Sequence, residues 1–282
     1  MDMRGKTVLI TGSTDGVGRH VATRLAAEGA KILIHGRSAE RAKTLIDEIV
    51  KAGDIAPTFY QADLSSMAGT RELAAAVIRD HQRLDVFVSN AGIGSQSDGP
   101  QRQESRDGHE LRFAVNYLAG FLLTSELLPL LKAGASARIV NVASAGQQAI
   151  DFDDVMLTHG YSGVRAYCQS KLAQILFTVD LAEQLKGTGI TVNALHPASY
   201  MDTTMVRQAG VTPWSSVETG ADAILDLAAS PSLEGRSGRY FDGQRESRAD
   251  AQAYDEKARR RLRALSLELT EQSSATSREK HS

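Results

Sequence analysis

The feature that most constrains the fold is an apolar strand that leads into a glycine-rich turn and a helix near the N-terminus. Residues 6–10 (Lys-Thr-Val-Leu-Ile) have the β-branched pattern of a buried parallel strand. Gly12, Gly16 and Gly18 follow, and a helix is expected from about 16 to 27. This arrangement points free backbone N–H groups at a phosphate and lets a dinucleotide approach the backbone. The turn alone is weak evidence, because turns also use glycine for steric reasons.

Apolar strands and helices continue to alternate along the chain, which predicts an α/β fold. Further strands are expected at 31–35, 57–61, 84–88, 137–142, 190–195 and 238–241. Helices are expected at 39–51, before 83, at 111–131, at 167–187 and at 216–229. We predict a doubly wound, Rossmann-type parallel sheet of about seven strands with helices on both faces. One domain is expected over residues 1–245, with a helical extension at 246–271 and a disordered tail at 272–282.

Composition excludes several classes of protein. The chain has 282 residues and a formal net charge of −2, so it lacks the basic excess of a nucleic-acid-binding protein. Its single cysteine, Cys168, and its seven scattered histidines offer neither an internal disulfide nor a metal-ligand cluster. No uninterrupted apolar run approaches the roughly 18 residues of a membrane span, and there is no signal-peptide pattern. We therefore expect a cytoplasmic protein without a metal, a nucleic-acid partner or a membrane span.

The end of the second strand bears on the choice of cofactor. A dinucleotide site usually has an acidic residue there that binds the ribose 2′-hydroxyl. None lies between Ala30 and Ala39, and Arg37 stands in that region instead. A guanidinium suits a 2′-phosphate in charge and in geometry, which favours NADP(H) over NAD(H). The competing interpretation is a solvated loop arginine.

Tyr167 and Lys171 lie four residues apart in a strongly apolar predicted helix. This spacing places them one turn apart, and an ammonium beside a phenol should lower the phenol pKa from its usual value of about 10. Such a tyrosine can transfer protons near neutral pH, although the pentapeptide alone is a common accident. Asn116, inside an apolar helix, is either a hydrogen-bonding fixture or a functional group. Ser144, after a strand, either caps a turn or faces a ligand.

Together these motifs resemble the short-chain dehydrogenase/reductase family. The residues that carry the resemblance are Thr11-Gly12-x-x-x-Gly16-x-Gly18, Asp63, Asn90-Ala91-Gly92, Asn116, Ser144 and Tyr167-x-x-x-Lys171. Residues 137–142, 166–173 and 195–197 are most similar to the branch of retinol dehydrogenases and WW-domain oxidoreductases. Three positions depart from the usual pattern, since Ser89 stands where an asparagine is common, Ala198 replaces a glycine and Thr203 comes one residue late.

The resemblance implies a role for each matching residue. Tyr167 would exchange a proton with the substrate, and Lys171 would lower its pKa and bind the nicotinamide ribose. Ser144 would stabilise the developing oxyanion, and Asn116 would hold a proton relay through water. The cofactor would contact Gly12, Ser13, Asp15, Gly16, Val17, Gly18, Arg37, Asp63, Leu64, Asn90, Ala91, Gly92, Tyr167, Lys171, Pro197 and Thr203.

These observations lead to an expected function and to two alternatives. We expect an NADP(H)-dependent oxidoreductase that interconverts a ketone or aldehyde and an alcohol, on a lipophilic small molecule. The alternatives are an NAD-linked alcohol dehydrogenase and a regulator that senses NADP(H) without turnover. The pocket walls would come from residues 94–106, 147–165 and 198–214. Because the helices at 111–131 and 167–187 are apolar on more faces than one sheet can cover, a homodimer or homotetramer is expected to form through them.

Overall fold

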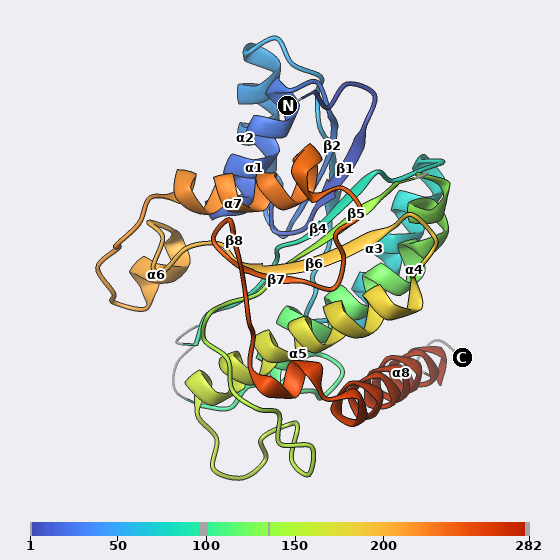
Figure 1. Ribbon diagram of the computed structural model, residues 1–282, viewed down its shortest axis with the longest axis vertical. Coiled ribbons are helices and arrows are strands. Elements are labelled where there is room, and N and C mark those ends of the chain that lie inside the picture. Colours follow the sequence, from blue (N-terminus) through green and yellow to red (C-terminus); the bar gives the residue numbers. More distant parts are fainter. Residues whose placement is uncertain (1, 96–100, 135, 280–282) are drawn as a thin grey trace.

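The computed structural model describes residues 2–95, 101–134 and 136–279, with side chains described up to 271. Eight strands form one sheet in the order β3-β2-β1-β4-β5-β6-β7-β8 (Figure 1). The strands are β1 (Thr7–Ile10), β2 (Lys31–Gly36), β3 (Thr58–Gln61), β4 (Val86–Ser89), β5 (Arg138–Val142), β6 (Thr191–His196), β7 (Tyr240–Asp242) and β8 (Arg245–Ser247). Strands β1 to β7 pair in parallel, and β8 is antiparallel to β7. The predicted doubly wound parallel sheet is confirmed.

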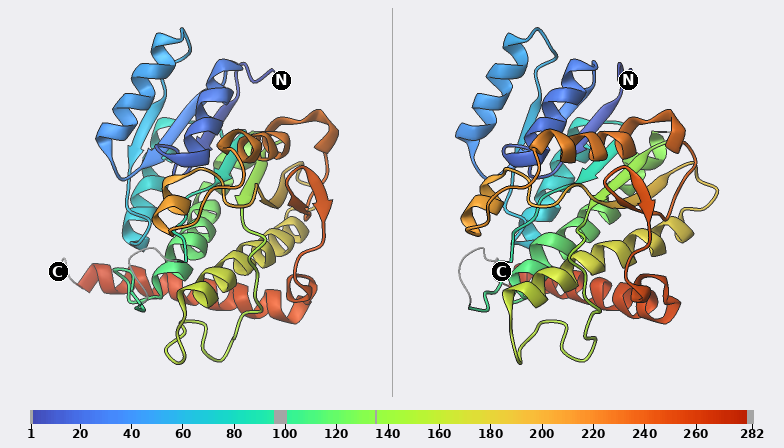
Figure 2. Two further views of the ribbon diagram at one scale, coloured as in Figure 1. Left: turned by 90° about the vertical axis from the view of Figure 1, so that its left-hand side faces the viewer. Right: turned by 60° about the vertical axis from the view of Figure 1, so that its left-hand side comes forward.

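Helices cover both faces of the sheet (Figures 1 and 2). One face packs against α1 (Gly16–Ala27), α2 (Ala39–Lys51) and α7 (Val217–Ala229), and the other against α3 (Met67–Asp80), α4 (Ala119–Ala133) and α5 (Gly163–Gln184). The other helical segments are η1 (Phe113–Leu118), α6 (Thr204–Gln208), η2 (Pro231–Leu233), η3 (Ala251–Tyr254) and α8 (Glu256–Glu279). Each face has its own core because side chains alternate along a strand: Leu9 faces α3 to α5, whereas Val8 and Ile10 face α1, α2 and α7.

Two local features differ from the prediction. Strand β8 was missed because its three residues, Arg-Glu-Ser, are all exposed and carry no apolar pattern. The apolar helix predicted at 111–131 contains a π-helical segment, η1, directly before α4. Whether a helix forms α- or π-type hydrogen bonds depends on packing and does not change the spacing of its apolar residues. The sequence could therefore not predict this segment.

The C-terminal helix α8 crosses the outer surface of α5 and α3 (Figure 2). Its Leu262 is 1% exposed, and Ser266 shares a 2.7 Å hydrogen bond with the buried Tyr117 hydroxyl. Arg263 pairs with Asp180 of α5 at 3.2 Å. The helix continues to Glu279, whereas a disordered tail was expected from 272; that tail stays a prediction, and residues 280–282 lie outside the described part.

The position of α8 bears on the predicted oligomer. The apolar surface of α5, which we expected to bind a second copy of the chain, lies under α8 within the same chain. Its apolar character therefore has an explanation that needs no partner. A homodimer or homotetramer stays a prediction, and it would have to use another surface.

Among the described residues, one helical stretch, Phe113–Ala133, is long and apolar enough to cross a membrane by length and composition. The sequence analysis overlooked it because Glu126 interrupts the apolar run. Within the best 18-residue window, 67% is buried inside the protein. The stretch packs into the core beside α3 and α5.

Candidate active site

The predicted cofactor residues gather where β1 and β4 end, in the middle of the sheet. From β1 the strand order runs through β2 to β3 on one side and through β4 and β5 on the other. Ligands of open α/β sheets bind at the carboxyl ends of the strands where the order reverses in this way. The glycine turn follows β1, the Asn90-Ala91-Gly92 turn follows β4, and Ser144 follows β5.

The glycine turn and the turn after β4 fit tightly against each other. Gly12 has a φ of +64°, and a Cβ there would lie 2.9 Å from the Cα of Ala91. Asn90 Nδ2 donates to the carbonyl oxygens of Thr11 at 2.8 Å and of Gly12 at 3.2 Å. A Cβ on Gly18 would lie 2.5 Å from the same Nδ2. Glycine is therefore required at 12 and 18 by contacts within the protein, besides any need to admit a cofactor.

The first turn of α1, which contains Val17, lies at the centre of this region. Asp15 caps the helix: its Oδ1 accepts from the Gly16 N–H at 2.8 Å, and its Oδ2 pairs with Arg41 at 2.8 Å. The partial positive charge of a helix N-terminus suits an anionic group. Thr203 lies next to this turn, because a Cβ on Gly16 would be 3.5 Å from the methyl carbon of Thr203. The late position of Thr203 in the sequence does not remove it from the glycine turn.

Some residues of the predicted cofactor set are buried structural groups. The Ser13 hydroxyl, with no exposed surface, donates to the Ile10 carbonyl at 2.8 Å. Leu64 is 6% exposed and belongs to the core on the α3 side. Only their main chains can face a cofactor. Pro197 follows β6 directly, at the start of the connection that carries Thr203.

The ends of β2 and β3 carry charges of opposite sign. Arg37 follows β2 and is exposed, and Gln61 Nε2 donates to its carbonyl oxygen at 2.9 Å. Burial pushes the pKa of Asp63 up, but hydrogen bonds from Ser65 and the charges of Arg106 and Arg37 hold it below its ordinary value. Arg106 Nη2 lies 3.5 Å from the Asp63 carboxylate. Sequence reasoning missed Arg106 because a loop far away in the chain brings it here.

Lys171 and Tyr167 lie on one side of α5, as their spacing predicted. The Lys171 Nζ is 5.8 Å from the centroid of the Tyr167 ring. It donates to the carbonyl oxygen of Val142, at the end of β5, and to Gln174 Oε1, both at 2.9 Å. These two bonds fix the ammonium between α5 and the sheet.

Ser144 and Asn116 complete the predicted catalytic group. Ser144 hydrogen-bonds to Tyr167, and its Oγ accepts from the Gly146 N–H at 3.0 Å. Asn116 lies in the π-helix, a feature often found at functional sites, and its Oδ1 accepts from the Ile93 N–H at 2.8 Å. Its Nδ2 donates to Ser170 Oγ of α5 at 3.0 Å.

Gly92 lies between two members of this group. A Cβ on Gly92 would be 3.2 Å from Asn116 Oδ1 and 3.5 Å from Lys171 Nζ. The structure thus brings together all four residues that the sequence analysis placed in catalysis.

The ionisation of Tyr167 differs from the expectation. Burial raises its pKa, and the hydrogen bond with Ser144 offsets only part of this rise. Burial also lowers the pKa of Lys171 to about 7. The expected lowering of the tyrosine pKa is therefore wrong, because Lys171 is itself desolvated and directed at Val142 and Gln174. At neutral pH the Tyr167 phenol keeps its proton.

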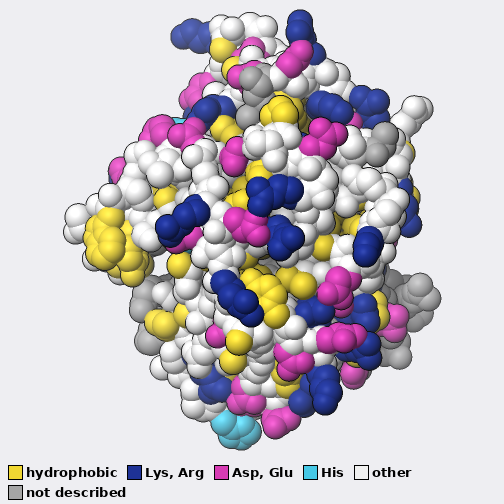
Figure 3. All heavy atoms as spheres, in the orientation of Figure 1, with side chains coloured by type: hydrophobic (Ala, Val, Ile, Leu, Met, Phe, Trp, Pro, Cys, Tyr) yellow, Lys and Arg dark blue, Asp and Glu magenta, His cyan; other side chains and the backbone are white. Residues whose placement is uncertain are grey.

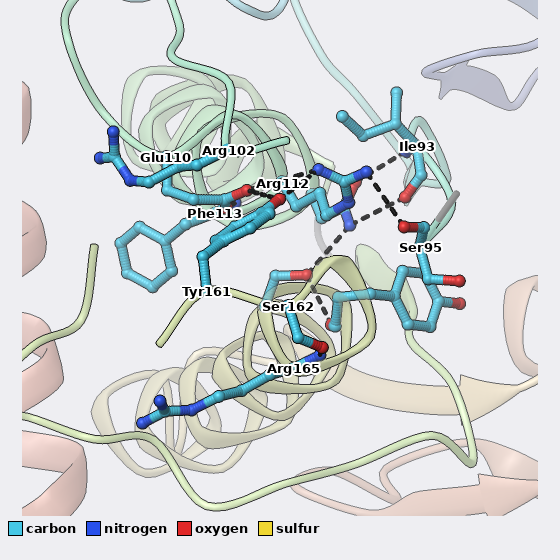
Figure 4. Close-up of polar contacts among 12 residues, drawn as sticks. Ile93, Ser95, Arg102, Glu110, Arg112, Phe113, Tyr161, Ser162 and Arg165 are labelled. Carbon is cyan, nitrogen blue, oxygen red and sulfur yellow. Dashed lines mark hydrogen bonds and ion pairs between the residues drawn. The ribbon is translucent and has the colours of Figure 1, made fainter. Parts of the chain in front are cut away.

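A buried arginine joins two loops beside the catalytic group (Figure 4). Arg112 donates to the carbonyl oxygens of Gly94 and Ser95, each at 3.1 Å, and to the Tyr161 hydroxyl at 2.7 Å. Its guanidinium lies 3.6 Å from Glu110, and the exposed fractions of the two side chains are 0% and 1%. The network connects the turn after β4 to the loop before α5. Sequence reasoning missed it because an arginine at a helix start is usually solvated.

Of the three predicted pocket walls, the loop at 147–165 is anchored to the C-terminal extension. Gln252 accepts from the Ile150 N–H at 2.7 Å and donates to the Ile150 carbonyl at 3.1 Å. Arg261 donates to the Phe152 carbonyl at 3.0 Å and pairs with Asp153 at 2.8 Å. Within the wall predicted at 94–106, residues 96–100 lie outside the described residues.

The third wall, the connection between β6 and α7, forms a loop with an apolar outer surface. A β-bridge between Met201 and Ser215 closes its base. Tyr200 and Trp214 stack edge to face at 4.8 Å, and Trp214 is 75% exposed. Hydrophobic side chains gather on the edge of the molecule that carries α6 (Figure 3). Tyr200 is close enough to Tyr167 to add to the rise of its pKa, so this loop borders the catalytic group.

Comparison with known proteins agrees with this site. Residues 6–213 match the short chain dehydrogenase family. Retinol dehydrogenase 13 of Homo sapiens is 38% identical over 94% of this chain and 84% of its own length, and retinol dehydrogenase 14 of Mus musculus is 36% identical over 92% and 84%. An uncharacterized protein from Mycobacterium Paratuberculosis matches with a TM-score of 0.78 at 26% identity, over 96% of this chain and 95% of its own. A short chain dehydrogenase from Escherichia coli CFT073, complexed with NADPH, matches with a TM-score of 0.68 at 26% identity, over 86% and 98%.

The comparisons overturn one expectation. The predicted cytoplasmic location is wrong: the chain is similar to retinol dehydrogenases 13 and 14, and among its described residues the stretch Phe113–Ala133 could cross a membrane by length and composition. The prediction rested on the absence of an apolar run and of a signal peptide. Neither absence is informative about an enzyme whose relatives are named for a lipophilic alcohol.

The fold, the arrangement of Ser144, Tyr167 and Lys171, and the relatives agree on one assignment. The match covers the glycine turn, the catalytic helix and the connection after β6 within one continuous segment. The chain belongs to the short-chain dehydrogenase family, and it is an oxidoreductase that acts on CH–OH groups.

Proposed function

We propose that the protein interconverts a lipophilic ketone or aldehyde and the corresponding alcohol with NADP(H). The observation that carries the proposal is the half-buried phenol of Tyr167, which hydrogen-bonds to Ser144 and lies 5.8 Å from the Lys171 ammonium, measured from the ring centroid. A bound nicotinamide cofactor would supply or accept the hydride. The small residues of the glycine turn and the N-terminus of α1 suit its diphosphate.

In carbonyl reduction, Tyr167 provides the proton. Negative charge develops on the substrate oxygen, and a hydroxyl within about 2.6–3.2 Å of that oxygen can protonate it. The raised pKa of Tyr167 keeps this hydroxyl protonated until the charge appears. Alcohol oxidation runs the same step in reverse and requires the phenolate.

Ser144 and Lys171 support this proton transfer. The Gly146 N–H occupies one lone pair of Ser144 Oγ, and the serine proton, which is shared with Tyr167, can be donated to the oxyanion when substrate is bound. Lys171, with a pKa of about 7, can supply positive charge beside the phenolate that forms. Asn116 keeps the turn after β4 and α5 at a fixed spacing through Ile93 and Ser170, and the water relay expected of it stays a prediction.

A lipophilic substrate is favoured by the loop after β6. Tyr200 and Trp214 expose a large apolar surface next to the catalytic group, where a long hydrocarbon could cover it. The relatives named retinol dehydrogenases point to the same chemical class. As a test, purified protein is mixed with NADPH and retinal, or with aliphatic aldehydes of increasing length, and the loss of NADPH absorbance is recorded. Activity that rises with chain length supports the proposal. Turnover of short polar carbonyls alone would contradict it.

NADP(H) preference should depend on Arg37. Replacing Arg37 by alanine is expected to lower the ratio of kcat/KM for NADPH to that for NADH by about 10- to 100-fold, because a charge-assisted contact with the 2′-phosphate is lost. Steady-state kinetics with both cofactors measure the ratio. Arg79, which is 70% exposed and pairs with Asp80 at the end of α3, provides the control, and Arg79→Ala should leave the ratio unchanged. A wild-type preference for NADH would refute the assignment.

A further inference from the structure

His35 is a buried residue of β2 for which the catalytic scheme has no use. It is 3% exposed, and its ring lies between two turns that the proposed function assigns to the cofactor. On one side the Gly12 N–H donates to His35 Nδ1 at 3.1 Å. On the other side His35 Nε2 lies 3.3 Å from the Ala62 carbonyl oxygen, directly before Asp63. The imidazole therefore touches the glycine turn and the turn after β3 at the same time.

The two contacts define the protonation state of the ring. Because the Gly12 N–H is a donor, His35 Nδ1 must carry the lone pair, and Nε2 carries the proton that it donates to Ala62. A protonated ring would place two N–H groups face to face at Gly12. Burial lowers the pKa of His35 to about 4; the hydrogen bond to Ala62 and the charge of Asp63 act against this, and the charge of Arg37 adds to it. The neutral tautomer is thus stable over the physiological pH range.

The main chain of β2 holds the same turn from a second direction. The Ser13 N–H donates to the His35 carbonyl at 2.9 Å, and the His35 N–H donates to Ser13 Oγ at 3.0 Å. These two bonds depend on the backbone and on Ser13, so they survive any change of the His35 side chain. The imidazole adds an acceptor for the N–H of Gly12, a residue that without a Cβ has few conformational restrictions of its own. Of the groups that bond to the glycine turn from β2, the imidazole is the one that also contacts the turn after β3.

We propose that His35 is a positioning residue for cofactor binding. Its ring holds the glycine turn, which faces the diphosphate, in a fixed relation to the turn at 62–64, which faces the other end of the nucleotide. Loss of the ring leaves the Gly12 N–H without its acceptor and removes the link between the two turns. The expected consequence is weaker binding of the whole dinucleotide. The proton-transfer group is not in contact with His35 and is unaffected.

Three substitutions separate the two contacts. His35→Leu removes both. His35→Asn keeps an oxygen near the position of Nδ1, so it can still accept from Gly12. His35→Gln extends an amide N–H toward the Ala62 carbonyl, but it places no acceptor at Gly12. The dissociation constants for NADPH and NADH are measured from cofactor fluorescence, and the melting temperature of each variant is measured without cofactor.

We expect His35→Leu to raise both dissociation constants by roughly tenfold, the scale of one or two lost buried hydrogen bonds. His35→Asn should stay within about threefold of wild type on the same scale, and His35→Gln should resemble the leucine variant. Thr178→Val is the matched control, because it removes a buried 2.8 Å hydrogen bond with Asn141 away from the turns; it should lower the melting temperature without changing either constant.

An unchanged NADPH constant in His35→Leu, or an asparagine variant that binds no better than the glutamine variant, would overturn the proposal. If the leucine variant fails to fold, the comparison of asparagine with glutamine still decides. The inference rests on nucleotide binding at the proposed site, but not on the choice of nucleotide. Loss of the His35 contacts should raise the dissociation constants of both NADPH and NADH. A wrong Arg37 assignment would concern only the preference for one cofactor over the other.

Discussion

Replacing Tyr167 by phenylalanine should lower kcat by about 10²- to 10⁴-fold and leave folding and NADPH binding near wild type. The substitution keeps the ring and removes only the hydroxyl. That hydroxyl is bonded to Ser144 and has a pKa raised by desolvation, so it is protonated when charge develops on the substrate oxygen. The other three residues are not placed to replace it as proton donor. Asn116 is bonded to Ser170, Lys171 is bonded to Gln174, and Ser144 itself accepts from Gly146.

The measurement combines a turnover assay on an accepted aldehyde with an NADPH titration of each variant. Tyr60→Phe is the control, since Tyr60 lies on β3 and bonds to Asp80 and His81, away from the catalytic group. It should keep the wild-type kcat. A Tyr167→Phe variant with more than about a tenth of wild-type kcat would remove Tyr167 as the proton donor, given the usual contribution of a general acid. Loss of NADPH binding in that variant would show a structural role instead.

The parts of the fold that were predictable have local signals. Residues 6–10, 31–35 and 84–88 are short β-branched runs, and each becomes a central parallel strand. The glycines at 12, 16 and 18 were identified because a turn between strand and helix needs them. The steric reason for two of them, contact with Asn90 and Ala91, became visible only in the structure.

The parts that were not predictable depend on burial and on contacts between distant segments. The expected lowering of the Tyr167 pKa treated Lys171 as a free ammonium, but desolvation acts on both groups and the buried Lys171 is bonded to Val142. A spacing of four residues gives proximity and says nothing about desolvation, which here decides the direction of the shift. His35 went unnoticed for a similar reason, because its partners lie 23 and 27 residues away in the chain.

Arg112 went unnoticed too, and its replacement by methionine should have the largest effect on stability. We expect the free energy of unfolding to fall by about 3–5 kcal/mol, because removing one partner leaves the Glu110 charge buried without its guanidinium. The carbonyl oxygens of Gly94 and Ser95 also lose a donor. Urea unfolding followed by circular dichroism measures the change. Arg79→Met, at an exposed pair, should change stability by no more than about 0.5 kcal/mol.

A second substitution tests the electrostatic reason. Glu110→Gln keeps a side chain of the same shape and removes the charge, so adding it to Arg112→Met should restore part of the lost stability. The Phe113 N–H, which donates to Glu110 at 2.7 Å, keeps an acceptor in the glutamine variant. A loss below about 1 kcal/mol in Arg112→Met, or a double variant less stable than the single one, would contradict the argument. The network joins the turn after β4 to the loop that leads into α5, so weakening it should also loosen the approach to Tyr167 and lower kcat in the variants that still fold.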